Sequence, residues 1–122
     1  MPKRILVVDD NVEAALTLQT LLKYGGHDVI AVHTPQCALD ALSQQPDVVV
    51  LDIGLPGMDG YELARQIRAK LGVSPLLIAV TGWGNPNDLM KAKQAGFDLH
   101  FTKPADPEHL IRTIEDCSPL AN

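Results

Sequence analysis

The chain has 122 residues, of which 46% are hydrophobic and 20% are charged, and its formal net charge is −5. This size and composition are typical of one soluble globular domain with its own core, and they exclude a disordered chain. The acidic balance also argues against nonspecific binding of nucleic acid, which requires a basic face. We expect a single domain over residues 1–122, with a core over about 3–117 and a tail at 118–122.

Taken in chain order, five short apolar runs alternate with five segments of helical periodicity. The runs predict strands over residues 5–8, 27–32, 47–51, 74–80 and 98–101. Apolar residues spaced by three and four predict helices after Asn11, Thr34, Gly60, Asn85 and Asp106, the second of them ending at Pro46. The apolar positions of the first expected helix are Ala14, Ala15, Leu18, Leu21 and Leu22, spaced by three and four. This alternation predicts an α/β fold with a doubly wound five-stranded sheet.

The expected strands run into chemically reactive side chains. The first is followed by Asp9 and Asp10, the third by Asp52, the fourth by Thr81 and the fifth by Lys103. Continuous aliphatic runs suit parallel strands covered on both faces, and in such sheets ligands bind at the carboxyl ends of the strands. We therefore expect three carboxylates, a hydroxyl and an ammonium at one edge of the sheet, as a strongly charged active site.

The three carboxylates predict a bound cation. Two carboxylates about 4 Å apart repel by roughly 4 kcal/mol at an effective dielectric constant near 20, and Asp52 adds to the repulsion between Asp9 and Asp10. Oxygen ligands with open positions suit Mg²⁺, or Mn²⁺ as the alternative. Beside such an ion, Asp52 can act as a nucleophile toward phosphorus. The competing interpretations are that an aspartate caps the first helix and that Asp52 is a passive ligand or a turn residue.

Lys103 and Thr81 complete the expected site. Lys103 precedes Pro104, and a tight turn at this bond would aim the ammonium back across the site. There it would balance the carboxylates and later pair with a phosphoryl oxygen. The hydroxyl of Thr81 would meet another phosphoryl oxygen. The competing interpretations are a solvated lysine and a threonine that serves strand packing.

Taken together, these features resemble the receiver domain of bacterial response regulators, from Lys3 to about Cys117. The motifs that carry the resemblance are Val7-Val8-Asp9-Asp10-Asn11, residues 51–60, Val80-Thr81-Gly82, Ala95-Gly96 and Lys103-Pro104. The resemblance implies a flavodoxin-like receiver fold, with five parallel strands in the order 2-1-3-4-5 and five helices.

The resemblance also implies a role for each site residue. Asp52 would accept the phosphoryl group, and Thr81 and Lys103 would hold it. Mg²⁺ would be bound by Asp9, Asp10, Asp52 and the carbonyl oxygen of Gly54. The domain would take its phosphoryl group from a phosphohistidine on a histidine kinase or histidine phosphotransfer domain, change conformation and later hydrolyse the aspartyl phosphate. It would have histidine kinase activity only as part of a larger hybrid kinase.

One switch position departs from the commonest receiver pattern. Receivers usually carry tyrosine or phenylalanine three residues before the lysine, and this chain has His100 there. Phe101 follows, but it should point to the opposite face of the strand. The expected switch couples Thr81 to His100 and acts on the face made by the fourth helix, fifth strand and fifth helix. A target protein that binds this face is a further candidate partner.

Three other classes of protein compete with this interpretation. A haloacid-dehalogenase-type phosphatase needs a second aspartate two residues after the nucleophile, where this chain has Gly54. A flavodoxin-like or nucleotide-binding module needs a phosphate loop rich in glycine or hydroxyl groups, where this chain has Asp9-Asp10-Asn11. A receiver that acts only as a scaffold would lack a site residue, and none is missing. The sequence therefore predicts a phosphorylatable receiver.

The cellular context is also predicted from short segments. Gly82-Trp83-Gly84 and residues 95–104 are similar to receivers of hybrid sensor histidine kinases, and a stand-alone regulator that binds a target protein is the alternative. The first apolar run is too short for a signal peptide or a membrane span, and Cys37 and Cys117 lack metal-ligand spacing. We expect a cytoplasmic domain with buried or half-buried thiols, without membrane contact or a nucleic-acid partner.

Overall fold

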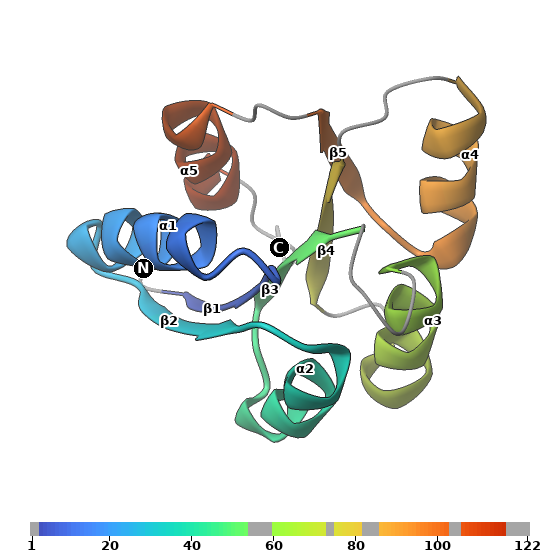
Figure 1. The fold of residues 1–122 in the computed structure, drawn as a ribbon, viewed down its shortest axis with the longest axis horizontal. Helices are drawn as coiled ribbons and strands as arrows, with labels where there is room; N and C mark the ends of the chain where they lie inside the picture. Colours follow the sequence, from blue (N-terminus) through green and yellow to red (C-terminus); the bar gives the residue numbers. More distant parts are fainter. Residues whose placement is uncertain (1–2, 54–59, 73–74, 82–85, 103–105, 117–122) are drawn as a thin grey trace.

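Five parallel strands form one sheet in the order β2-β1-β3-β4-β5 (Figure 1). The structure is a computed structural model that describes residues 3–53, 60–72, 75–81, 86–102 and 106–116. The strands are β1 (Arg4–Val8), β2 (Asp28–Val32), β3 (Val48–Asp52), β4 (Leu76–Thr81) and β5 (Leu99–Thr102). The helices are α1 (Val12–Tyr24), α2 (Pro35–Ala41), α3 (Gly60–Leu71), α4 (Pro86–Ala95) and α5 (Pro107–Asp116), with a 3₁₀ turn η1 (Leu42–Gln44) after α2. The predicted fold and strand order are confirmed.

The helices cover both faces of the sheet. Helices α1 and α5 pack on one face, against alternate strand residues such as Ile5 and Val50. Helices α2, α3 and α4 pack on the other face, against the residues in between, such as Leu6 and Val49. Because successive side chains of a strand point to opposite faces, a central strand must be apolar along its whole length. This explains the continuous aliphatic runs of β1 and β3.

The buried face of α1 includes only some of the apolar positions of the helix. Ala15 and Leu22 are fully buried against the sheet, but Ala14 is exposed and Leu21 is 39% exposed. Ala14 and Leu21 line a cavity that also borders Pro107, at the start of α5. These two apolar positions therefore lie outside the core, because α1 shares its face of the sheet with α5 and leaves this cavity beside it.

Helix α2 ends earlier than predicted. After Ala41 the chain makes one 3₁₀ turn, and Gln45 then takes a left-handed conformation with φ of 55°. The following proline disfavours right-handed helical geometry at Gln45, so the helix cannot continue to Pro46.

Cys37 lies on the exposed side of this short helix, which corrects the prediction of a buried or half-buried thiol. Cys117 lies outside the described residues.

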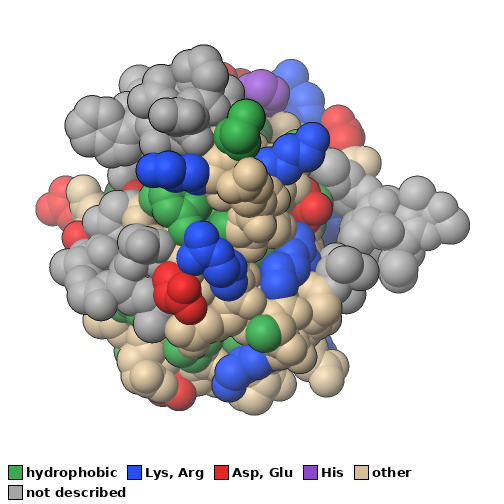
Figure 2. Space-filling model, turned by 90° about the vertical axis from the view of Figure 1, so that its right-hand side faces the viewer, with side chains coloured by type: hydrophobic (Ala, Val, Ile, Leu, Met, Phe, Trp, Pro, Cys, Tyr) green, Lys and Arg blue, Asp and Glu red, His purple; other side chains and the backbone are tan. Residues whose placement is uncertain are grey.

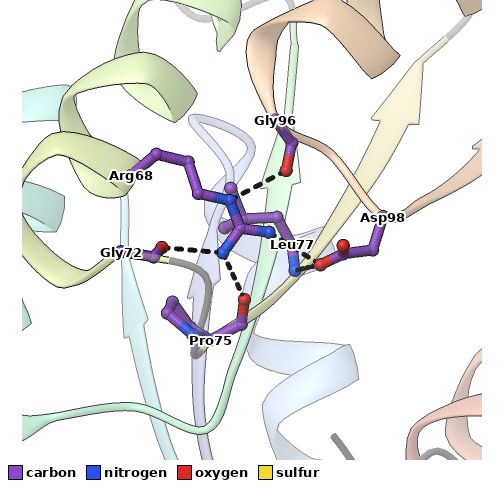
Figure 3. Close-up of polar contacts among 6 residues, drawn as sticks. All are labelled: Arg68, Gly72, Pro75, Leu77, Gly96 and Asp98. Carbon is purple, nitrogen blue, oxygen red and sulfur yellow. Dashed lines mark hydrogen bonds and ion pairs between the residues drawn. The ribbon is translucent and has the colours of Figure 1, made fainter.

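Arg68 links several chain segments at the amino edge of the sheet, opposite the carboxyl ends of the strands (Figure 3). Its guanidinium donates to the Asp98 carboxylate at 2.7 Å, and the same carboxylate oxygen accepts the N–H of Leu77 at 2.9 Å. The guanidinium also donates, at 2.9, 3.1 and 2.7 Å, to the carbonyl oxygens of Gly96, Gly72 and Pro75. One side chain therefore fixes the ends of α3 and α4 relative to the starts of β4 and β5.

Residue 96 must be glycine because its backbone lies against the Arg68 side chain and has a positive φ. Its φ is 109°, and an added Cβ would lie 2.7 Å from Cγ of Arg68. Both the backbone conformation and the contact exclude other residues unless the neighbourhood shifts. The Ala95-Gly96 motif therefore ends α4 against the Arg68 side chain.

Several basic side chains lie on the face of the molecule that carries α3 and α4 (Figure 2). The exposed basic residues of these two helices are Arg65, Lys70, Lys91 and Lys93.

Within the described ranges, none of the helices has the length and apolar character needed to cross a membrane.

Candidate functional site

Three carboxylates meet at the carboxyl edge of the sheet. The register pairs Val8 of β1 with Leu51 of β3, so the residues that follow on each strand lie side by side. One carboxylate oxygen from each of Asp9, Asp10 and Asp52 lies within 4.8 Å of the other two. The structure thus brings together the three aspartates that the sequence places at strand ends.

The backbone of Asp9 is held in line with the sheet. Its N–H donates to the carbonyl oxygen of Val32 at 3.1 Å, which extends the pairing of β1 with β2 by one residue. Its carboxylate Oδ1 accepts the N–H of Asn11 at 2.9 Å. Its carbonyl oxygen lies 3.1 Å from Nδ1 of His33. These contacts fix both the position of the residue and the direction of its side chain.

Asn11 caps α1, as its position before the helix predicts. Its side-chain oxygen accepts the N–H of Ala14 at 3.1 Å, and its φ of −80° and ψ of 103° are those of an extended N-cap residue. The alternative in which Asp9 or Asp10 caps the helix is therefore excluded. Their carboxylates are directed to the cluster instead.

Asp52 is the most buried member of the cluster. It is the last residue of β3 and is 6% exposed, directly after the fully buried Leu51. Burial of a carboxylate beside two others is unfavourable unless a positive charge compensates for it. The observed donor set is made of oxygen atoms only, which is the set that Mg²⁺ prefers. The residues present therefore fit a divalent cation.

Gly60, the first residue of α3, contacts Ile53, which directly follows Asp52. Its N–H donates to the carbonyl oxygen of Ile53 at 3.0 Å. A Cβ at Gly60 would lie only 2.6 Å from Cα of Ile53, a distance that real Cβ atoms essentially never show. The glycine therefore allows α3 to begin directly against the residue after the candidate acceptor. Gly54, the predicted carbonyl ligand, lies outside the described residues.

Thr81 lies at the same edge on the neighbouring strand. Asp52 pairs with Val80 in the register of β3 and β4, so Thr81 is one residue farther toward the carboxyl end. Its side chain is buried, with the residue 2% exposed, and it pairs with Thr102 of β5. This placement agrees with the predicted position of the hydroxyl. Lys103, predicted to be its partner in holding the phosphoryl group, lies outside the described residues.

His100 and Phe101 point to opposite faces of β5, as predicted. Phe101 packs with the cluster beneath α1 and α5, and its ring meets that of His109 edge-on with centroids 5.2 Å apart. His100 instead lines a cavity of about 230 Å³ with Ala92 and Lys93 of α4. The residue at the switch position therefore faces α4, and the neighbouring aromatic residue faces α5.

A larger cavity of about 470 Å³ opens beside the acidic cluster. Asp9 and Asp52 line one end of it. The rest is lined mainly by apolar or small side chains of α1 and of the sheet, among them Ala14, Leu18, Leu21, Val50 and Val80. The site is therefore a charged end of a mostly apolar groove along α1.

Sequence reasoning missed His33 as a site residue. It follows β2 directly, and its ring nitrogen contacts Asp9 from there. The rule that located the aspartates, namely that strand ends of a parallel sheet converge, applies to β2 as well. His33 was overlooked because the expected second strand ends in Val32 without a carboxylate or hydroxyl.

A five-stranded parallel sheet of order 2-1-3-4-5 with an aspartate cluster at its carboxyl edge defines a phosphoacceptor receiver fold, and comparison with known proteins agrees. The family model "Response regulator receiver domain" matches residues 5–115. The chain belongs to this family. Receiver domains as a class bind Mg²⁺ and interact with histidine kinase or phosphotransfer partners.

Two curated relatives are sensor kinases. The chain is 36% identical to the sensor histidine kinase GacS of Pseudomonas protegens, over 97% of this chain and 13% of that protein. It is 35% identical to the sensor protein GacS of Pseudomonas syringae pv. syringae, over 97% of this chain and 14% of that protein. The chain thus spans only about one seventh of the length of these relatives, and it is similar to the receivers of hybrid kinases.

Solved structures show the same fold. The CheY-like receiver domain protein of Methanospirillum hungatei is 27% identical with a TM-score of 0.87, over 95% of this chain and 93% of that one. A DrrB receiver domain activated with BeF₃ is 30% identical with a TM-score of 0.87, over 94% of this chain and 96% of that one. The chain is therefore a receiver domain of two-component signal transduction.

Proposed function

We propose that Asp52 of this receiver accepts a phosphoryl group from a phosphohistidine, in a reaction that requires Mg²⁺. The observation that carries the proposal is the buried carboxylate of Asp52, whose oxygen lies within 4.8 Å of those of Asp9 and Asp10. An exposed turn residue or a helix cap would need neither the burial nor the clustering. The family supplies the reaction class, and the geometry supports the choice of Asp52 among the three aspartates.

In the proposed reaction a carboxylate oxygen of Asp52 attacks the phosphorus atom. A new P–O bond forms while the P–N bond of the phosphohistidine breaks, and the electron pair goes to the imidazole nitrogen, which takes a proton. Hydrolysis later transfers the phosphoryl group from Asp52 to water and restores the carboxylate. Because Asp52 ends a rigid buried strand, its oxygen is presented to the donor with little freedom to move.

We assign the divalent cation to Asp9, Asp10 and Asp52, with the carbonyl oxygen of Gly54 as the further ligand that the family suggests. Bound there, the cation would neutralise the crowded carboxylates and the charge that develops on the phosphoryl oxygens. Mg²⁺ is the preferred ion and Mn²⁺ the alternative, because all the donors are oxygen atoms.

Thr81 and Lys103 are proposed to hold the phosphoryl group after transfer. Thr81 lies one residue beyond the level of Asp52 on the adjacent strand, within the same edge. Its hydroxyl would donate to one phosphoryl oxygen, and the ammonium of Lys103 would pair with another. His100 is proposed to respond to the movement of Thr81, because Thr81 and His100 lie on adjacent strands with Ala79 paired to His100.

The proposed donor is a helical histidine kinase or phosphotransfer domain that docks along α1. The groove of about 470 Å³ is lined by apolar side chains of α1 and reaches Asp52 at one end. Val12 and Leu16 are each 47% exposed, but the helical repeat places them on the other flank of α1, away from this groove. A helix that lies on α1 could place its phosphohistidine at the charged end of the groove.

The proposed context is the receiver of a hybrid sensor histidine kinase, with residues 1–122 as one receiver domain. The similarity to GacS supports this context. Because the phosphoryl group of such a relay comes ultimately from ATP, the proposal places the domain in the cytoplasm. A second candidate is a regulator that binds a target protein, which the cavity between β5 and α4 at His100 favours.

The test is phosphorylation by acetyl phosphate in the presence of Mg²⁺, followed by mass measurement of the intact protein. The wild-type chain should gain one phosphoryl group, and Asp52→Asn should gain none. Asp28→Asn is the matched control, because Asp28 is an exposed aspartate at the start of β2, at the opposite edge of the sheet. Undiminished incorporation in Asp52→Asn would refute the assignment of the acceptor.

Partner experiments separate the two contexts. The phosphorylated domain is mixed with a purified histidine phosphotransfer domain, and the phosphoryl group is followed on both proteins. Rapid loss to a partner histidine supports the relay. A stable complex that depends on phosphorylation and involves no transfer supports the regulator that binds a target.

A further inference from the structure

We propose that His33 is a positioning residue for the acidic cluster, holding the loop that carries Asp9 and Asp10 in its metal-binding arrangement. This inference rests on the proposed function, because it concerns the affinity of that site for its divalent cation. The carrying observation is the contact of 3.1 Å between Nδ1 of His33 and the carbonyl oxygen of Asp9.

The direction of this hydrogen bond is fixed by its chemistry. A carbonyl oxygen can only accept, so the Nδ1 atom of His33 must carry the hydrogen and donate it. The ring is half-buried, and the bond joins the residue after β2 to the last turn of chain before α1. It therefore links two loops that are 24 positions apart in the chain.

The bond acts on a loop that electrostatic repulsion tends to open. Oxygen atoms of three carboxylates lie within 4.8 Å of one another, and repulsion between them favours any movement that separates Asp9 and Asp10 from Asp52. The N–H of Asp9 is bound by Val32 and its carbonyl oxygen by His33, so the peptide units on both sides of Asp9 are anchored to the end of β2. A site that is already assembled binds its ligand without the cost of rearrangement.

The described contacts of His33 indicate no other structural role for this residue. The N-cap of α2 is Thr34, whose hydroxyl accepts the N–H of Cys37 at 3.1 Å. The histidine is therefore not needed to begin the helix that follows it. Its ring is also outside the set of acidic and histidine side chains whose ligand atoms converge at the cluster, so it acts on the site through Asp9.

The test measures metal affinity directly, by titration with Mn²⁺ while the free ion is followed by electron paramagnetic resonance. We expect His33→Ala to weaken Mn²⁺ binding by about tenfold, at the lower end of the range for residues that support metal ligands. His33→Asn should restore most of the affinity, because its amide N–H can donate to the same carbonyl oxygen. Gln36→Ala is the matched control, since it removes only an exposed bond to Asp40 in α2.

A second readout separates positioning from ordinary stabilisation. The melting temperature of each variant is measured without Mg²⁺ and at one fixed, subsaturating Mg²⁺ concentration. If His33 positions the ligands, His33→Ala lowers the rise in melting temperature at a fixed, subsaturating Mg²⁺ concentration, and His33→Asn recovers it. Equal melting shifts for wild type and His33→Ala, together with equal Mn²⁺ affinity, would overturn the inference and leave the metal site standing. Absence of Mn²⁺ binding by the wild-type protein would overturn the metal site and this inference together.

Discussion

The two edges of the sheet use polar side chains in opposite ways. At the amino edge, opposite charges and carbonyl groups are matched: Arg68 binds Asp98 and three carbonyl oxygens. At the carboxyl edge, three like charges are brought within 4.8 Å of one another. Both arrangements arise at the ends of the same parallel strands, so the fold itself does not dictate the difference. The amino edge contributes stability, and the carboxyl edge holds a charge repulsion that a bound cation can relieve.

A second cluster at the amino edge follows the same pattern. The buried ring of His27 accepts the N–H of Lys3 at Nδ1, at 3.1 Å, which leaves Nε2 to donate to the Glu115 carboxylate at 3.2 Å. The Lys3 ammonium also donates to the carbonyl oxygen of Ile114, near the end of α5. The start of β1, the turn before β2 and the end of α5 are thereby joined. The comparison predicts losses of stability for variants at the amino edge and gains for variants at the carboxyl edge.

Removal of Arg68 should have the largest effect on stability. We expect Arg68→Ala to lower the free energy of unfolding by about 3 kcal/mol, because several carbonyl groups and Asp98 lose a half-buried charged donor. Denaturant unfolding measures the loss, and Mn²⁺ titration should show unchanged metal affinity. Arg65→Ala on the same helix is the control, since its ion pair with Glu62 is exposed and contributes little. Equal effects of the two variants would contradict the role given to the Arg68 contacts.

Loss of His27 should have the next largest effect. We expect His27→Ala to lower the free energy of unfolding by about 2 kcal/mol, because a buried ring and two hydrogen bonds are lost. Phosphorylation at the opposite edge should continue at the wild-type level once the protein is folded. Glu115→Gln keeps an acceptor for Nε2 and should cost much less. A reduced phosphorylation yield in fully folded His27→Ala would show that the two edges are coupled.

Neutralisation of one carboxylate should stabilise the metal-free protein. We expect Asp10→Asn to raise the free energy of unfolding by about 1 kcal/mol without metal, a modest gain because Asp10 is exposed and partly screened. The same variant should bind Mg²⁺ more weakly. Added salt should reduce the gain, since it screens the repulsion in the wild-type protein. If Asp28→Asn at the amino edge gave the same gain, the effect would reflect net charge rather than crowding.

The sequence is informative at the carboxyl edge and much less so at the amino edge. A charged residue at the end of an aliphatic run is visible in the chain, and parallel strands must bring such ends together, which is why Asp9 and Asp52 were predicted. The strand order came from the resemblance, because periodicity does not encode it. Arg68 was missed because its partners are carbonyl oxygens of distant turns, which any residue supplies.

The exposure of apolar residues on α1 and the omission of His33 have a common cause. Periodicity identifies which residues are apolar, but the neighbours that cover them are set by tertiary packing, and Leu21 faces the groove beside α5 instead of the core. Similarly, a histidine after a strand carries no signal until the loop opposite it is known. Contacts between loops are therefore the part of this site that only the structure supplies.

Substitution of His100 should have the smallest effect on stability. Its expected consequence is a change in the response of β5 and α4 to phosphorylation. We expect His100→Phe to change the free energy of unfolding by less than about 0.5 kcal/mol, because the half-buried side chain borders a cavity of about 230 Å³ that can accept an aromatic ring. If His100 responds to Thr81, the shifts that beryllofluoride induces in NMR spectra of β5 and α4 should differ between this variant and the wild type. Phe101→Leu, on the face toward α5, is the matched control and should leave the shifts in α4 largely unchanged. Identical beryllofluoride responses in wild type and His100→Phe would remove His100 from the switch, while the phosphoacceptor role of Asp52 would still stand on its own test.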